Sequence, residues 1–93
     1  MTIVEVLKKS AVLLENLHPA VKQATIKLIS DCYDRGIYIR ITQGLRTIAE
    51  QNALYAQGRT TKGNVVTNAK GGYSWHNFGY AIDFVLNQSA QNL

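Results

Sequence analysis

Apolar residues recur at helical spacing in the first third of the chain. Between residues 1 and 17 this spacing predicts one amphipathic helix, whose apolar face would consist of Ile3, Leu7, Ala11, Leu14 and Leu17. A second helix is predicted from Pro19 to Arg35, because proline suits the first helical turn and Gly36 provides a helix stop. Its apolar face would consist of Val21, Ala24, Leu28 and Cys32.

The pattern then changes from helical to alternating. The segment Ile37–Thr42 places an isoleucine at every second position, which predicts a strand with Ile37, Ile39 and Ile41 facing the core. Thr47 and Glu50 have the spacing of a capping box, in which each side chain accepts a hydrogen bond from the other residue's backbone N–H. A third helix is therefore predicted from Ile48 to Gln57.

The last third of the chain has few packing residues before a final apolar run. Arg59–Tyr73 is rich in glycine, threonine and asparagine, so we interpret it as a long loop of the kind that is usually functional. Tyr80–Leu86 is predicted to be a second strand, and residues 87–93 a polar tail. The fold class is α+β: one domain over residues 1–93, with two or three helices packed on a small antiparallel sheet.

Composition excludes several classes of protein. With 46% hydrophobic and 17% charged residues, the chain is globular and not disordered. Its single cysteine, Cys32, excludes a disulfide scaffold, and no apolar run approaches the ~20 residues of a membrane span. Glu5 precedes Lys8 and Lys9 at the N-terminus, which is unlike an export signal. We therefore expect no signal peptide, no membrane partner and synthesis in the cytoplasm.

The net charge of +4 lies entirely in residues 35–93, because acids and bases cancel in residues 1–34. This excess indicates an anionic partner, such as nucleic acid, cell-wall polymer or an acidic peptide. The basic residues are scattered, however, and ordinary surface solvation explains them equally well. Since the chain also lacks a recognised nucleic-acid-binding motif, we expect no nucleic-acid partner.

The residues with catalytic chemistry are concentrated in Gly71–Asp83, where His76 precedes Asp83 by seven positions. A carboxylate among apolar strand residues is costly unless it is paired or bound to a metal, and imidazole and carboxylate are both good zinc ligands. The alternatives are that Asp83 pairs with Arg40 or Arg46, and that His76 is a hydrogen-bonded loop residue. Spacing alone does not decide between these interpretations. Three aromatic residues of this region are interpreted as packing residues, with contact to a glycan or peptide as the alternative: Tyr73, Trp75 and Phe78.

The pattern Ser-x-His-x-x-Gly-x-Ala-x-Asp over residues 74–83 resembles a family signature. The family is that of the zinc D-Ala-D-Ala carboxypeptidases and L-alanyl-D-glutamate endopeptidases, which cut the stem peptides of peptidoglycan. Gln-Gly-Leu-Arg at 43–46 and the segment 50–60 are similar to the same family, especially to its phage endolysins and bacterial cell-wall hydrolases. The likeness extends from about Leu17 to Leu86.

This resemblance implies roles for individual residues. His76 and Asp83 would be two of three protein ligands of a zinc ion, and Arg46 would bind the substrate carbonyl and stabilise the oxyanion. The alternative for Arg46 is a structural ion pair with Glu50 or Asp83. Two further residues are expected to orient ligands or substrate, or else to stabilise the loop or helix: Ser74 and Gln51.

The chain departs from the family pattern after Asp83. The family carries a late Glu/Asp-x-x-His segment, which provides the general base and the third zinc ligand, and residues 84–93 contain no such residues. The only other histidine, His18, is interpreted as a helix entry and Cys32 as a core residue. We therefore expect an incomplete zinc site, a truncated chain that is inactive alone, and self-association through an exposed sheet edge. Action at the bacterial cell wall is expected if the protein is released. The alternative function is a non-catalytic domain that binds wall peptide or a protein partner.

Overall fold

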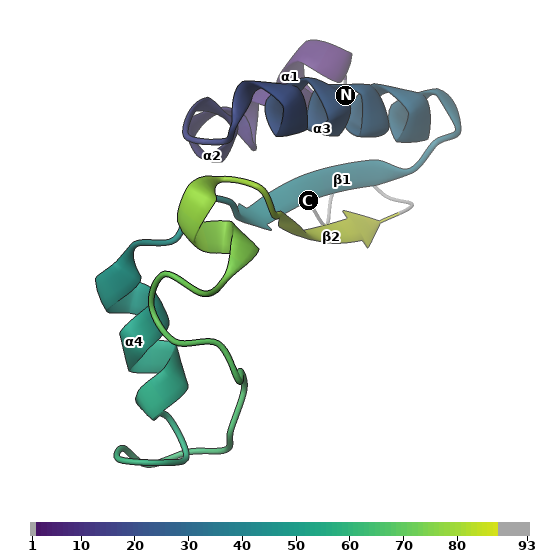
Figure 1. The fold of residues 1–93 in the computed structure, drawn as a ribbon. Helices are drawn as coiled ribbons and strands as arrows, with labels where there is room; N and C mark the ends of the chain where they lie inside the picture. Colours follow the sequence, from purple (N-terminus) through teal and green to yellow (C-terminus); the bar gives the residue numbers. More distant parts are fainter. Residues whose placement is uncertain (1, 88–93) are drawn as a thin grey trace.

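The computed structural model describes residues 2–87 and confirms the predicted α+β class (Figure 1). In these residues the helices and strands follow one another in the order α1 Ile3–Lys8, α2 Ala11–Glu15, α3 Pro19–Asp34, β1 Tyr38–Gln43, α4 Ile48–Ala56, the 3₁₀ helix η1 Trp75–Phe78 and β2 Asp83–Asn87. No helix in this part of the chain is long and apolar enough to cross a membrane. The predicted polar tail, apart from Asn87, lies outside the described residues.

The first predicted helix is wrong in one respect, because the structure has two short helices in its place. The helical conformation is interrupted after α1, and Ser10 is buried between the two helices. Its hydroxyl accepts a hydrogen bond from the backbone N–H of Ile41 at 2.9 Å, which ties the break to β1. Of the expected apolar face, Leu14 and Leu17 are buried, whereas Ala11 is exposed.

The second predicted helix agrees with α3 almost to the residue. It ends at Asp34, and Gly36 follows with a positive φ of 76° that favours glycine. Its buried face differs from the prediction, since Thr25 and Ile29 are buried while Ala24 and Leu28 are exposed. The predicted face is therefore partly right, since its other two members, Val21 and Cys32, are half-buried and pack against the core.

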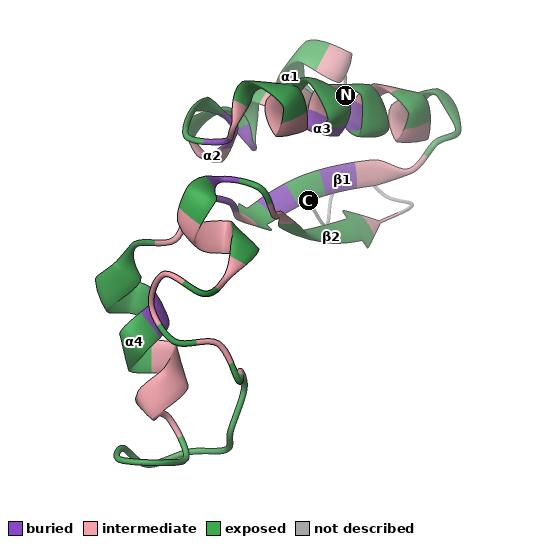
Figure 2. Cartoon of the chain, in the orientation of Figure 1, coloured by how far each residue is buried: buried purple, intermediate pink, exposed green. Residues whose placement is uncertain are grey.

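The two strands form an antiparallel sheet, and the helices α1 to α3 lie against one face of it (Figure 1). Ile39 and Ile41 of β1 are buried, as predicted (Figure 2), whereas Ile37, the third predicted core residue, is half-buried and precedes the strand. The partners of Ile39 and Ile41 in β2, Leu86 and Phe84, are exposed. The second strand begins at Asp83 and not at Tyr80, because the chain first leaves η1 through a turn.

The fourth helix and the long loop extend away from this layer (Figure 1). The radius of gyration is 15.0 Å, against about 12 Å for a compact chain of this length. The prediction of a loop over Arg59–Tyr73 is confirmed, since it contains no helix or strand. Two side chains of α4 hold this loop: Gln51 donates to the carbonyl of Ala69 at 2.7 Å, and Asn52 accepts from the N–H of Gly71 at 2.8 Å.

Candidate metal centre

The 3₁₀ helix η1 presents His76 from a turn that is fixed at both ends. The Ser74 hydroxyl accepts a hydrogen bond from the His76 backbone N–H at 3.2 Å. The Asn77 side chain accepts from the N–H groups of Gly72 and Ser74 and donates to the carbonyl of Arg46 at 2.9 Å. The backbone N–H of Arg46 in turn donates to the carbonyl of His76 at 2.8 Å. This network connects the turn that carries His76 to the segment that carries Arg46.

The His76 ring has a defined tautomer when it is neutral. Its Nδ1 lies 2.9 Å from the carbonyl oxygen of Gly44, which can only accept, so Nδ1 carries the proton. The lone pair of the neutral ring is therefore on Nε2, and Nε2 lies 3.5 Å from Oδ1 of Asp83. Metal-binding histidines in proteins are commonly oriented by such a hydrogen bond from the other ring nitrogen.

The separation of these two atoms suits a shared metal ion. Two ligands that bind zinc at ~2.0–2.1 Å with tetrahedral angles lie about 3.4 Å apart. The observed 3.5 Å between Nε2 of His76 and Oδ1 of Asp83 is close to this value. Both atoms are acceptors when the ring is neutral, so a cation between them would remove an unfavourable contact. The donor set and its spacing therefore fit two of the ligands of a zinc site.

Asp83 reaches this position for a different reason from the one expected. Its side chain is 58% exposed, so the predicted cost of burying a carboxylate in an apolar strand does not apply. Asp83 is the first residue of β2 and is opposite Gln43, next to an irregularity in the register of the sheet. The start of the strand, and not the apolar interior of the sheet, brings the carboxylate to His76.

Arg46 lines the same site from the segment between β1 and α4. Only 12% of its side chain is exposed, and its Nη1 donates to Oε1 of Gln51 at 2.7 Å. Its Nη2 lies 3.7 Å from Oδ2 of Asp83, so the alternative ion pair with Asp83 exists as a long contact. Glu50, the other alternative partner, instead accepts from the N–H of Thr47. The buried Nε of Arg46 has no partner among the described residues.

The two residues that were expected to orient ligands or substrate, Ser74 and Gln51, make hydrogen bonds to His76 and Arg46. Ser74 holds the turn of His76, and the fully buried Gln51 connects Arg46 to the loop at Ala69. Sequence reasoning missed Asn77, which connects η1 to Arg46. Its position three residues after Ser74 is a capping-box spacing, and this is the signal that could have revealed it.

A third metal ligand is missing from the described part of the chain. Within residues 2–87 no group of three His, Cys, Asp or Glu side chains is placed to hold a metal ion. As predicted, His18 lies at the entry to α3, where it is the N-cap and its ring accepts from the N–H of Ala20. Cys32 packs against the core, also as predicted. Neither residue therefore completes the site.

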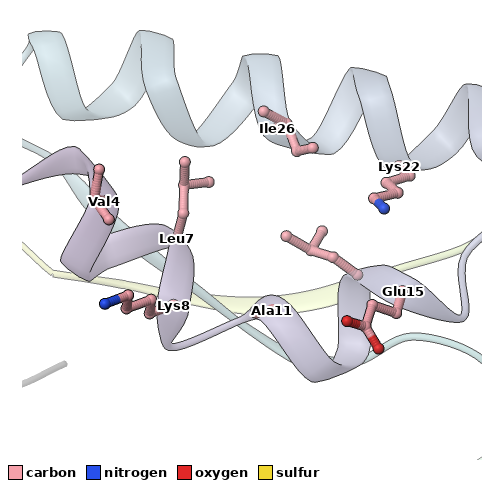
Figure 3. A pocket seen from close by; sticks show the side chains of 8 residues that line it. Val4, Leu7, Lys8, Ala11, Glu15, Lys22 and Ile26 are labelled. Atoms are coloured by element: carbon pink, nitrogen blue, oxygen red, sulfur yellow. The ribbon is translucent and has the colours of Figure 1, made fainter.

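An apolar groove on the helical side is separate from this site. It encloses about 300 Å³ between α1, α2 and α3, and Val4, Leu7 and Ile26 line it (Figure 3). Lys8, Glu15 and Lys22 lie at its rim (Figure 3). It contains none of the three converging side chains, so it has no part in the chemistry of the metal centre.

Comparisons with protein families and with individual known proteins agree with each other. Residues 14–93 match the VanY family, described as D-alanyl-D-alanine carboxypeptidase. The chain is also 54% identical over 71 residues to the peptidoglycan L-alanyl-D-glutamate endopeptidase CwlK of Bacillus subtilis (strain 168). The aligned region is 76% of this chain and 42% of that relative, so the chain spans less than half of the relative's length.

Proposed function

This chain belongs to the VanY family of D-alanyl-D-alanine carboxypeptidases, and we propose that it contributes to a zinc peptidase acting on the stem peptides of peptidoglycan. The observation that carries the proposal is the convergence of His76, Asp83 and Arg46. Nε2 of His76 lies 3.5 Å from one carboxylate oxygen of Asp83, and Nη2 of Arg46 lies 3.7 Å from the other. A peptidase with this substrate would act at the bacterial cell wall.

Each residue has a role that its surroundings support. His76 and Asp83 would hold the zinc ion, which, when bound by three protein ligands, supplies an acidified water and polarises a carbonyl. Arg46 would donate hydrogen bonds to the carbonyl oxygen of the substrate, where negative charge develops. The hydrogen bond from Nη1 to Gln51 and the low exposure of the Arg46 side chain indicate a guanidinium fixed in place before substrate binds. Ser74 and Asn77 hold the turn that positions His76.

Zinc binding tests the metal centre directly. We expect calorimetric titration of the 93-residue chain to show weak binding of one zinc ion, because only two ligands converge in its described part. His76→Ala and Asp83→Asn should each abolish this binding. His18→Ala is the matched control, since His18 caps α3 and is expected to leave zinc binding unchanged. Zinc binding that survives His76→Ala but not His18→Ala would refute the assignment.

Catalysis by these 93 residues alone is expected to be undetectable. A positioned general base typically contributes ~10²–10⁴-fold to rate, and residues 2–87 show neither such a base nor a third ligand beside His76 and Asp83. The assay is release of new amino groups from purified cell walls with added zinc. Cleavage that depends on zinc and disappears in His76→Ala would contradict the expectation.

The second candidate function is binding of wall peptide without cleavage, and the absence of a third ligand within residues 2–87 favours it. The two functions differ in their need for metal. A peptidase site should bind a stem peptide more tightly with zinc present, whereas a binding domain should hold it equally well after chelation. Titration of a synthetic stem pentapeptide with and without a chelator separates them.

A further inference from the structure

Three aromatic side chains lie exposed around the turn that carries His76. The exposed fractions are 81% for Tyr73, 73% for Trp75 and 55% for Phe78, which corrects the interpretation of these residues as packing residues. The core is instead formed by aliphatic side chains of the helices and β1. Large exposed aromatic groups gathered in one place usually mark an interaction site. Together with Gly72 and Ser74 these three rings line a hollow of about 140 Å³, which we call the aromatic hollow.

The aromatic hollow and the metal centre are neighbouring faces of one turn. A 3₁₀ helix has three residues per turn, so Trp75 and Phe78 lie on the same side of η1. His76 follows Trp75 and is rotated by about a third of a turn, toward Gly44 and Asp83. A ligand in the aromatic hollow would therefore lie beside a substrate held at His76.

The backbone of the hollow and the Trp75 ring are held in place before any ligand binds. The rings of Trp75 and Tyr80 meet edge to face with centroids 6.2 Å apart, and the N–H of Tyr80 donates to the carbonyl of Trp75. The N–H of Tyr73 donates to the carbonyl of Lys70, and Asn77 holds Gly72 and Ser74. A ring that is already ordered, as Trp75 is, loses little conformational entropy on binding.

We propose that the aromatic hollow binds a sugar ring of the glycan strand to which the stem peptide is attached, a proposal that rests on the proposed function. A pyranose ring has one face made of C–H groups, which stacks on an aromatic face, and an edge of hydroxyl groups. The hollow offers both kinds of partner, with the rings of Tyr73, Trp75 and Phe78 beside the polar Ser74. An apolar peptide side chain could use the rings but not the hydroxyl hydrogen of Ser74, whose oxygen already accepts from the N–H of His76.

The proposal has a consequence for which bond is cleaved. The first stem-peptide bond is one residue from the sugar-linked end, about 3.5 Å along an extended chain, whereas a terminal D-Ala-D-Ala bond is about four residues, or ~14 Å, away. Trp75 and His76 are adjacent in the chain, so a sugar in the aromatic hollow would bring the sugar-linked end of the stem peptide to the turn that carries His76. The arrangement therefore favours the endopeptidase reaction over the carboxypeptidase reaction.

The single tryptophan makes the test direct, since the intrinsic tryptophan fluorescence of the chain comes from Trp75 alone. Tetra-N-acetylchitotetraose is added to the zinc-free 93-residue protein, and we expect a saturable change in emission. Phe78→Ala and Tyr73→Ala should weaken the binding by about three- to tenfold each. Phe84→Ala is the matched control, because Phe84 is an exposed phenylalanine on β2, outside the hollow, and should leave the affinity unchanged.

Several results would overturn the proposal. The first is that Trp75 emission does not change up to the solubility limit of the sugar. The second is that Phe84→Ala and Phe78→Ala weaken the binding equally. The third is that emission responds to phosphatidylcholine vesicles or to a sugar-free stem peptide and not to the tetrasaccharide. The measurement needs no metal, so it is independent of the zinc assignment. Zinc binding without sugar binding would refute the aromatic hollow alone, and sugar binding without zinc binding would refute the metal centre alone.

Discussion

Replacing the buried Gln51 by leucine should loosen the region that holds Arg46. Gln51 is fully buried, and its side chain accepts from Nη1 of Arg46 and donates to the carbonyl of Ala69, both at 2.7 Å. Gln51→Leu keeps the approximate volume of the side chain but removes both hydrogen bonds. It leaves a charged donor and the carbonyl of the half-buried Ala69 without these partners.

The expected cost is worked from these two contacts. A hydrogen bond to a charged group contributes about 1.5–3 kcal/mol and a neutral one about 0.5–1.5 kcal/mol, so their joint loss should cost about 3 kcal/mol. The cost should be local, because α4 and its loop extend away from the sheet and helices α1 to α3 (Figure 1). Opening of α4 would then become about 100-fold more frequent, since 1.4 kcal/mol corresponds to a factor of ten.

Native-state amide hydrogen exchange measures this opening residue by residue. Amides of α4 and the N–H of Gly71 should lose about 100-fold in protection, while the N–H of Ile41, bonded to Ser10 in the core, should keep its protection. Gln57→Leu is the matched control, because the side chain of Gln57 makes one exposed hydrogen bond, to the carbonyl of Asn64. This variant should change protection by less than about fivefold. Equal effects of the two variants, or an equal loss at Ile41, would refute the reasoning.

The remaining predictions concern the core, a helix cap and the sheet edge. Ser10→Ala should destabilise the fold by about 1–3 kcal/mol in thermal unfolding, because the buried N–H of Ile41 loses its acceptor; an unchanged midpoint would argue against this. The backbone N–H of Thr47, followed by its hydroxyl, lowers the pKa of Glu50 from the ordinary 4.5. The capping contribution of Glu50 should therefore be complete above pH 4.5 and disappear as the pH falls through the lower folded pKa; Thr47→Ala should raise that pKa in an NMR titration, and an unmoved pKa would contradict this. The outer edge of β2, with Phe84 and Leu86 exposed, should cause self-association at high concentration that Leu86→Lys prevents; sedimentation of the unaltered chain as a monomer would count against it.

Local signals predict most of the fold because the contacts that decide it are local. The capping box at Thr47 and Glu50 and the stop at Gly36 involve residues within a few positions of each other, and both occur as predicted. The break in the first predicted helix cannot be found this way. It depends on the hydrogen bond between Ser10 and Ile41, which are 31 residues apart in the sequence.

The sequence predicts the members of the candidate site but not how the site is built. His76, Asp83 and Arg46 follow from the resemblance to a family pattern, and the structure brings them together. The expectation that Asp83 is a carboxylate buried in an apolar strand is wrong, because the residue is at the exposed start of β2. The burial of a strand residue depends on which other residues cover that face of the strand. The alternation of apolar and polar residues along the strand does not show what covers each face.

The hydrogen bonds that support the site could not be predicted from the sequence, because they join segments that are distant in the chain. His76 depends on the Gly44 carbonyl for its tautomer, and a backbone carbonyl has no signature in a sequence. Asn77 connects η1 to Arg46 across 31 positions, so neither end predicts the other. A short segment therefore carries His76 on one face and aromatic rings on another, with both faces held by partners distant in the chain. Removing Asn77 should disturb both faces together, whereas removing Phe78 should affect the aromatic hollow alone, and this difference follows from where each side chain makes its contacts.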